Sequence, residues 1–268
     1  YLLGGSAMTV QGLRDQTEDI DLAVGVTAEF EHVYQTLTNR VFTVAGEPTA
    51  PFEGVGRTVE LCHDDRGLQL DLFERQIVGK VWLTERMHDR ASEFWVGTHA
   101  KTFVLSDEDM FLLKAVSGGD LAGGRHRDLE DMRVYAQRGI DYEAVVTEIE
   151  AQRPFNTGPT EARQIRDRSH PLFAVETAVS SLTGLPDRFT SEISAFTTEF
   201  EVEYTVLGAV DDGITDVETI RERVRSGART LSDEQHDATD EAIHRLTTKQ
   251  ILDRDGQTVR HRSPSIST

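Results

Sequence analysis

Two aspartates separated by one residue stand near the start of the chain. Asp19 and Asp21 lie in the run EDIDLAV, in which acidic and apolar residues alternate. Successive side chains of a β-strand point to opposite faces, so the run predicts a strand over 19–24 with both carboxylates on one face. Neighbouring carboxylates repel each other unless a cation joins them, and Mg²⁺ prefers carboxylate, water and phosphate oxygens. The pair therefore predicts a magnesium site, with two solvated carboxylates at a sheet edge as the alternative.

A glycine turn precedes the aspartate pair. Gly4, Gly5 and Ser6 follow a short apolar segment and lead into a short helical stretch. Backbone N–H groups at a glycine turn can bind phosphate oxygens, and glycine lets the backbone approach a phosphate closely. The Ser6 hydroxyl can donate a hydrogen bond to the same phosphate. The turn predicts a nucleotide-binding loop, and a plain connection between two elements is the alternative.

A third carboxylate occurs in the stretch GLQLDLF. Its leucines alternate with Gln69 and Asp71, so it predicts a strand over 67–73 with Asp71 on the face opposite the leucines. Taken alone, an aspartate in such a position is more often a surface residue.

The elements that position these residues are those of an α/β (α+β) domain. The strands described above are joined by predicted helices, one capped by Thr27 and another by Ser106, which three acidic residues follow. The signals become mostly helical after residue 105 and change again near residue 199. The sequence thus predicts an α/β core over 1–105, a helical extension over 106–198 and a C-terminal module over 199–268.

The C-terminal module has the signals of three helices and a hairpin. A helix is predicted over 200–210, the capping boxes TDVE and SDEQ open two more, and Asp255-Gly256 marks a hairpin turn. This order resembles a winged helix-turn-helix. Residues 244–262 carry five basic and two acidic residues in an acidic chain, which predicts contacts with DNA phosphates. The candidate DNA-binding residues are Arg245, Lys249, Arg254 and Arg260, and a structural or protein-docking module is the alternative.

The N-terminal motifs together resemble a known signature. Gly-Ser, a short spacer, Asp-x-Asp and a later carboxylate are the pattern of nucleotidyltransferases of the DNA polymerase β superfamily. Over residues 1–150, the stretches GGSAMTVQGLRDQTEDIDL, LDLF and LSDEDMFLLKAVSGGDLAGGRHRDLEDM resemble the AbiE-type toxin nucleotidyltransferases. The resemblance implies a nucleotidyltransferase fold with a mixed sheet, and Mg²⁺ held by Asp19, Asp21 and Asp71 as catalytic residues.

The same resemblance implies further nucleotide contacts. Gly4, Gly5 and Ser6 would bind the triphosphate, and Lys114 and Arg127, the latter followed by Asp128, match positions near the nucleotide. A lysine on such a helix often extends to the surface instead, and an arginine beside acidic residues often pairs with them.

Two functions remain open at this stage. The first is a nucleotidyltransferase that moves a nucleoside monophosphate from an NTP to a hydroxyl of tRNA or of a protein, in a toxin–antitoxin or defence setting with a cognate antitoxin as partner. The second is a non-catalytic scaffold whose C-terminal module binds DNA as a regulator. Both rest on resemblance of fold and family, which does not by itself establish a function.

The composition indicates the class of protein and its compartment. The net charge is −19, from 47 acidic and 28 basic residues of which only four are lysine, and this balance resembles halophilic archaeal proteins. No apolar run is long enough for a membrane span and no leader is visible, so a cytoplasmic protein without membrane contact is predicted. Cys62 is the only cysteine, which excludes an internal disulfide, and the histidines lack metal-ligand spacing.

Overall fold

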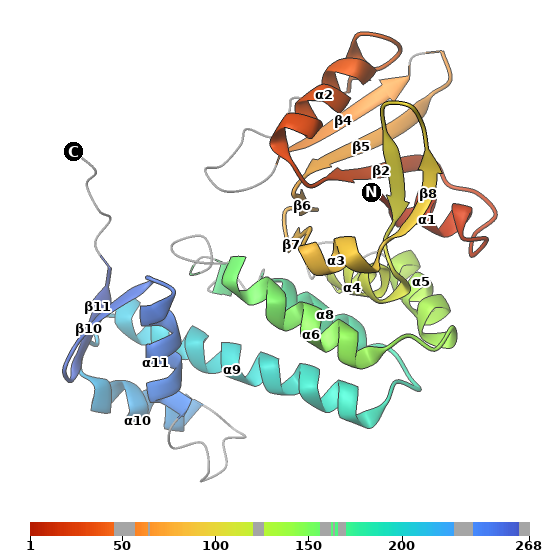
Figure 1. Cartoon of the computed structure of the whole chain (residues 1–268). Helices are drawn as coiled ribbons and strands as arrows, with labels where there is room; N and C mark the ends of the chain where they lie inside the picture. The colour runs from red at the N-terminus through yellow and green to blue at the C-terminus, as the bar shows by residue number, and fades with distance from the viewer. Residues whose placement is uncertain are drawn as a thin grey trace, which may run out of the picture.

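The chain has a mixed α/β fold. A sheet built from the N-terminal part lies at one end of the molecule, and helices extend from it towards a C-terminal hairpin (Figure 1). The computed structural model describes residues 1–45, 57–63, 65–119, 126–155, 162, 164–165, 170–227 and 238–262.

The main sheet is mixed. In spatial order its strands are β3 (Thr43–Val44), β4 (Thr58–His63), β5 (Leu68–Glu74), β2 (Asp19–Val24), β1 (Leu2–Leu3), β9 (Lys101–Val104) and β8 (Ser92–Val96). β2 and β5 are parallel neighbours, whereas β1 runs antiparallel to β2 and parallel to β9. Alternation of apolar and polar residues predicts β2 and β5, and the structure confirms both strands.

One face of the sheet is covered by α2 (Thr27–Thr38). Phe30 of this helix packs with Leu70 and Leu72 of β5 in a small apolar core. The prediction that Thr27 caps the helix is wrong, because Val26 holds the cap position and Thr27 is already helical. The Thr27 hydroxyl instead bonds to the carboxylate of Glu74 and helps to lower its pKa, against the raising effect of burial.

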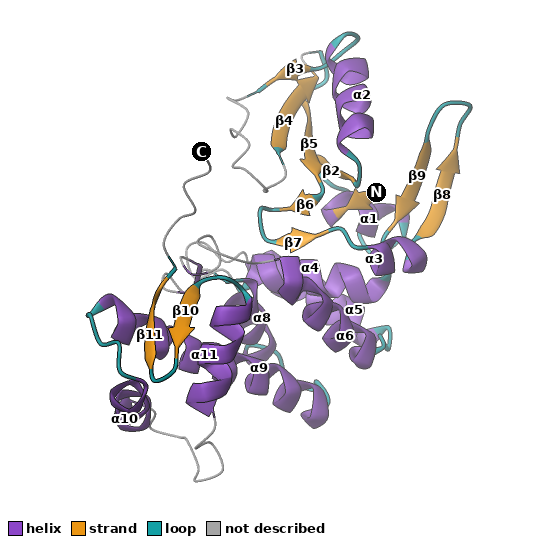
Figure 2. Ribbon diagram, turned by 60° about the vertical axis from the view of Figure 1, so that its left-hand side comes forward, coloured by secondary structure: helices purple, strands orange, loops and turns teal. Residues whose placement is uncertain are grey.

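The opposite face of the sheet packs against helices (Figure 2). α1 (Gly4–Val10) and α4 (Asp107–Gly118) bury their apolar side chains there, together with Ala23 of β2 and Phe73 of β5. Ser106 caps α4 as predicted, accepting a hydrogen bond from the Asp109 N–H at 3.3 Å. The following elements are α5 (His126–Gln137), α6 (Tyr142–Gln152), the 3₁₀ turn η1 (Arg153–Phe155), α8 (Pro171–Ser180) and α9 (Asp187–Asp211).

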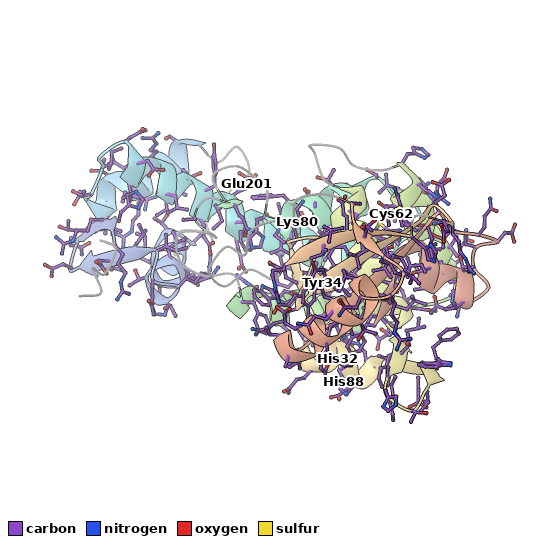
Figure 3. The ribbon with its side chains drawn as sticks, turned by 90° about the horizontal axis from the view of Figure 1, so that it is seen from above. His32, Tyr34, Cys62, Lys80, His88 and Glu201 are labelled. Carbon is purple, nitrogen blue, oxygen red and sulfur yellow. The ribbon has the colours of Figure 1, made fainter. Side chains whose placement is uncertain are left out.

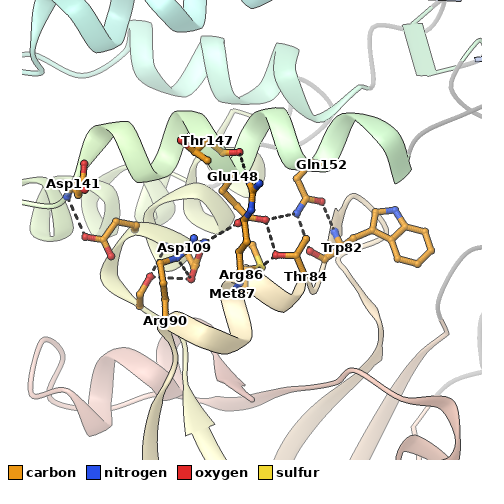
Figure 4. A network of polar contacts seen from close by, with 12 residues as sticks. Trp82, Thr84, Arg86, Met87, Arg90, Asp109, Asp141, Thr147, Glu148 and Gln152 are labelled. Atoms are coloured by element: carbon orange, nitrogen blue, oxygen red, sulfur yellow. Dashed lines mark hydrogen bonds and ion pairs between the residues drawn. The ribbon is translucent and has the colours of Figure 1, made fainter. Parts of the chain in front are cut away.

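A polar network ties the sheet end of the molecule to these helices (Figure 4). Arg90 lies at the end of α3 (Glu85–Arg90), between Asp109 of α4 and Glu148 of α6, and pairs with both carboxylates. Glu148 also accepts hydrogen bonds from Thr84 at 2.8 Å and Gln152 at 3.0 Å. The network therefore fixes α3 against two helices of the extension.

A small hairpin follows β5 without a clear signal in the sequence. It consists of β6 (Gln76–Ile77) and β7 (Val81–Trp82), which form a separate two-stranded sheet. Gln152 of α6 binds both backbone groups of Trp82, its amide oxygen accepting from the N–H at 2.7 Å and its amide nitrogen donating to the carbonyl at 2.9 Å. The base of the hairpin is thus fixed to the helices.

The C-terminal part contains the expected helices and hairpin. α9 is one helix of 25 residues, so the helix predicted over 200–210 begins earlier and runs through the boundary drawn at 198/199. α10 (Val217–Gly227) and α11 (Ala238–Thr248) follow, then β10 (Leu252–Asp255) and β11 (Thr258–His261). The capping box SDEQ lies outside the described residues. The winged helix-turn-helix assignment stays a prediction.

The helices share one apolar core with the sheet. It extends from Leu2 in β1 to Val259 in β11, so the three predicted regions pack against one another without an apolar gap. Among the residues that the structure describes, no helix is long and apolar enough to cross a membrane.

Candidate active site

The three candidate carboxylates lie on one face of the sheet. Asp21 of β2 is the direct neighbour of Asp71 of β5 in the parallel register, and adjacent strands lie about 4.8 Å apart. Asp19 is two residues before Asp21 and so points to the same side. The same faces of the two strands continue into Ala23 of β2 and Phe73 of β5, which are buried in the core that contains α1 and α4. The carboxylates therefore lie on the side of the sheet that packs against α1 and α4, opposite the side that α2 covers.

A cavity of about 420 Å³ lies in front of this face. Asp19, Asp21 and Asp71 all line it, as does Gly5. An adjoining cavity of about 90 Å³ shares Asp21 and adds apolar walls from β1, β6 and α4. The other charged residues that line the larger cavity are Arg14, Lys80, Lys114, Arg127 and Asp128.

Four acidic and four basic side chains thus line one cavity. This arrangement suits a ligand that carries negative charge and binds together with metal ions.

The glycines of the turn are required by neighbouring side chains. Gly4 has φ +56°, and a Cβ added to it would overlap the carboxylate of Asp21. A Cβ on Gly5 would lie 2.6 Å from both the Arg14 guanidinium and the Thr17 hydroxyl. The structure therefore gives the two glycines a role beside the one predicted from phosphate binding: they make room for the groups that line the cavity.

Ser6 is engaged within the protein. Its side chain is buried, and its hydroxyl donates to the Leu3 carbonyl at 2.8 Å and lies 3.4 Å from the N–H of Asp21, which donates to it. These two bonds link the start of α1 to β2. In this structure the hydroxyl proton predicted to reach a phosphate is directed at Leu3, so Ser6 helps to position Asp21.

Lys114 takes part in a buried group of charges. Its ammonium lies 2.7 Å from Asp128 and 2.8 Å from Asp131, both on α5. Arg14 binds Asp131 through both carboxylate oxygens, at 2.6 and 2.8 Å. Two cations and two carboxylates therefore balance one another, and the charge of Lys114, predicted to contact the nucleotide, is compensated by the protein.

Arg127 and two basic residues that the sequence reading missed complete the cavity wall. Arg127 is exposed at the start of α5 and forms no ion pair with any described residue. Arg14 and Lys80 line the same cavity. No spacing motif marks either of them, and Arg14 meets its partner Asp131 across 117 positions of the chain, so only the fold reveals their place.

The chemistry of the carboxylate face suits a magnesium ion. All three predicted ligands supply oxygen, the donor that Mg²⁺ prefers. Among the described residues, no three His, Cys, Asp or Glu side chains form a ready metal-binding group. Mg²⁺ is commonly held by one or two carboxylates together with water and substrate phosphates, so the paired Asp21 and Asp71 with Asp19 nearby fit an ion that arrives with a nucleotide.

The candidate DNA-binding residues differ in their ion-pair partners and exposure. Arg245 donates to Glu203 at 2.6 Å, and Lys249 lies 3.9 Å from the other oxygen of this fully buried carboxylate between α9 and α11. Arg254 lies 3.2 Å from Asp240, and Arg260 is exposed on β11. Two of the four cations therefore pair with a carboxylate that is buried between helices.

Comparison with known proteins does not assign the chain to a family. No family model matches the chain, and no curated protein matches it. A solved structure, "Crystal structure of JHP933 from Helicobacter pylori", is similar over 78% of this chain and 88% of that chain, with 14% identity and a TM-score of 0.34. Similarity at this level carries no inference about activity.

Gly4→Ala is expected to disturb the site more than Gly12→Ala. Both glycines have positive φ, so each alanine strains the backbone by about 1–2 kcal/mol, but only at Gly4 does the new methyl group meet Asp21. Should the site be active, we expect Gly4→Ala to lower its rate by about tenfold or more, measured under single-turnover conditions. Gly12, which has nothing within 4 Å of its added Cβ, serves as the matched control. Equal losses in both variants would contradict the proposed contact.

Proposed function

We propose that this protein is a Mg²⁺-dependent nucleotidyltransferase that moves a nucleoside monophosphate from an NTP to a hydroxyl group. The observation that carries the proposal is the placement of Asp19, Asp21 and Asp71 on one face of two adjacent strands, lining one cavity with four basic residues. The resemblance of the motifs over residues 1–150 to the AbiE-type nucleotidyltransferases supports the same reaction.

Each residue of the site has its own role in the proposed reaction. Asp19 and Asp21 would supply ligand oxygens for the metal that accompanies the triphosphate, and Asp71, beside Asp21, would face the incoming hydroxyl. When bound, Mg²⁺ would neutralise phosphate charge and lower the pKa of the attacking hydroxyl. The bond between the acceptor oxygen and the α-phosphorus forms while the hydroxyl proton passes to water, the α–β anhydride bond breaks, and pyrophosphate leaves. The basic residues of the wall stabilise the negative charge of the triphosphate.

The acceptor is proposed from resemblance. The AbiE-type relatives suggest a tRNA 3′ end or a side-chain hydroxyl of a protein, in a toxin–antitoxin or defence setting with an antitoxin as partner. The competing proposal is a DNA-binding regulator built on a catalytically silent scaffold. Its basis is weakened by the contacts of Arg245 and Lys249 with the buried Glu203, because this carboxylate compensates part of their charge.

Transfer of label from an NTP tests the proposal directly. The purified protein, in high KCl with Mg²⁺, is incubated with each α-³²P-labelled NTP together with total tRNA or cell lysate. We expect label on RNA or protein from at least one NTP, and its loss when EDTA replaces Mg²⁺. A folded protein that transfers no label from any NTP would contradict the proposal and favour the scaffold.

A further inference from the structure

We infer that the smaller of the two adjoining cavities, of about 90 Å³, holds the base of the nucleotide and that Val78 is the apolar side chain that contacts it. The inference deepens the proposed function and rests on it. Val78 lies in the turn between β6 and β7, an element that carries no motif, and it lines both cavities. Lys80, at the end of the same turn, marks this position between the sheet and the long helices in Figure 3.

The two cavities differ in the residues that line them. The larger cavity contains the carboxylate face and all four basic residues. The residues that line only the smaller cavity are all apolar or glycine, namely Leu3, Gly4, Ile77, Met110 and Leu113. A nucleotide has the same division, because its charged triphosphate and its planar base lie at opposite ends. Apolar walls with few polar groups are the usual environment of a bound ring.

Asp21 determines which end of the nucleotide enters which cavity. It lines both cavities, and in the proposed reaction it would hold the metal beside the α-phosphate, which joins the nucleoside to the outer phosphates. The outer phosphates then extend past the basic residues of the larger cavity, and the base extends into the smaller one. A volume of about 90 Å³ has room for about six water molecules, which is the space of a planar ring system and not of a whole nucleotide.

Val78 has a backbone conformation that suits other residues better. Val78 and Gly79 have φ of +48° and +67°, and the Lys80 N–H donates to the Ile77 carbonyl at 3.0 Å. These are the features of a type I′ turn, whose first central position favours Asn, Asp or Gly. A β-branched residue rarely adopts this conformation, so valine lowers the stability of the turn.

The fold buries the Val78 side chain only in part. Val78 is 44% exposed, whereas Ile77 and Val81 on either side of the turn are 3% and 1% exposed. Backbone strain beside a cavity is a feature of functional sites, and a ligand that covers an exposed apolar side chain gains affinity from its burial. The hairpin is tied to α6 through Gln152, so Val78 is held at the cavity by a fixed turn.

Equilibrium binding tests the contact between Val78 and the base. The affinity of the full chain for each α,β-methylene NTP with Mg²⁺ is measured by titration calorimetry at constant KCl. The NTP analogue that binds most tightly is then compared with the same compound in which hydrogen replaces the base. We expect Val78→Asn to weaken binding of the intact analogue about threefold to tenfold, and binding of the compound without a base by less than about twofold.

The stability of the same variant is a second readout. Asparagine is favoured at this turn position and relieves the left-handed strain of valine, so the midpoint of thermal unfolding is expected to rise by about 2 °C. Lower affinity in a more stable protein is the result expected for a residue that serves binding and not packing. Val78→Ile, which keeps both the strain and the apolar contact, is expected to bind the analogue within about twofold of the wild type.

Gln250→Asn is the matched control, because Gln250 also has positive φ, at +61°, and is exposed after α11. It should relieve strain in the same way without changing affinity for either compound. Analogue binding that is unchanged in folded Val78→Asn would overturn the inference and leave the proposed function standing. An equal loss for the compounds with and without a base would also overturn it, since Val78 would then only position the turn. A wild type that binds no NTP analogue would overturn both.

Discussion

Replacing Asp21 by asparagine is expected to reduce nucleotide transfer by about 1000-fold while the fold is retained. Asp21 is the central carboxylate of the face, directly beside Asp71 in the register and two residues from Asp19. Asparagine keeps the shape of the side chain but removes the charge that would hold the metal and balance it in the transition state, an effect of about 10²–10³-fold for a single group in such a site. The single-turnover rate of label transfer to the acceptor of the wild type measures the loss.

A second measurement on the same variant distinguishes a functional carboxylate from a structural one. Asparagine keeps the shape of the side chain, so the variant is expected to stay folded at the assay temperature, which its thermal unfolding checks. Glu18→Gln is the matched control, because Glu18 is exposed and does not line the cavity, and it should transfer at nearly the wild-type rate. Transfer by Asp21→Asn within a few-fold of the wild type would show that the carboxylate face is not the site.

The strands of the candidate site could be predicted from local pattern, but their pairing could not. Alternation places Asp19 and Asp21 on one face of β2 and Asp71 on one face of β5, and both strands are confirmed. The sequence does not state that β2 and β5 are neighbours, or that Asp21 and Asp71 share a register position. Register between parallel strands depends on the packing of both faces, which only the complete fold determines.

The ion-pair partners of the charged residues are harder to predict from the sequence than the strands that carry the site. Arg14 and Asp131, which lie far apart in the chain, meet at 2.6 Å and compensate each other next to Lys114. In the C-terminal module, the fully buried Glu203 binds Arg245. A count of charges along the sequence treats each group as solvated, whereas the fold commits some cations to buried carboxylates. The net basic character of residues 244–262 therefore overstates the charge available to DNA.

Replacing Arg90 by methionine is expected to destabilise the protein by about 3–5 kcal/mol, the usual cost of removing one partner from a buried ion pair. Asp109 and Glu148, the two carboxylates that Arg90 joins, have side chains exposed to only 0% and 1% (Figure 4). In the variant both would remain buried without their cation, although Thr84 and Gln152 still donate to Glu148. The free energy of unfolding, from denaturant titration, measures the loss.

The matched control for this variant is Arg86→Met on the same helix. Arg86 is exposed, and its guanidinium donates to the Thr147 carbonyl at 3.3 Å. Removing this contact is expected to change the free energy of unfolding by less than about 1 kcal/mol. A loss in Arg90→Met no larger than that of the control would show that α3 is held by apolar packing and not by the network.

The pH dependence of the Arg90→Met variant tests whether the buried carboxyls cause the loss. Burial raises the pKa of Asp109 above its ordinary value, and Arg90 opposes that rise. Without Arg90 the pKa of Asp109 in the folded state should rise further. A carboxyl whose folded pKa exceeds its unfolded pKa stabilises the fold in acid, and this contribution is lost as the pH rises through the folded value. The difference in the free energy of unfolding between wild type and variant should therefore be smaller at about pH 5 than at about pH 7. A deficit that is independent of pH would instead assign the loss to packing of the arginine side chain against its neighbours.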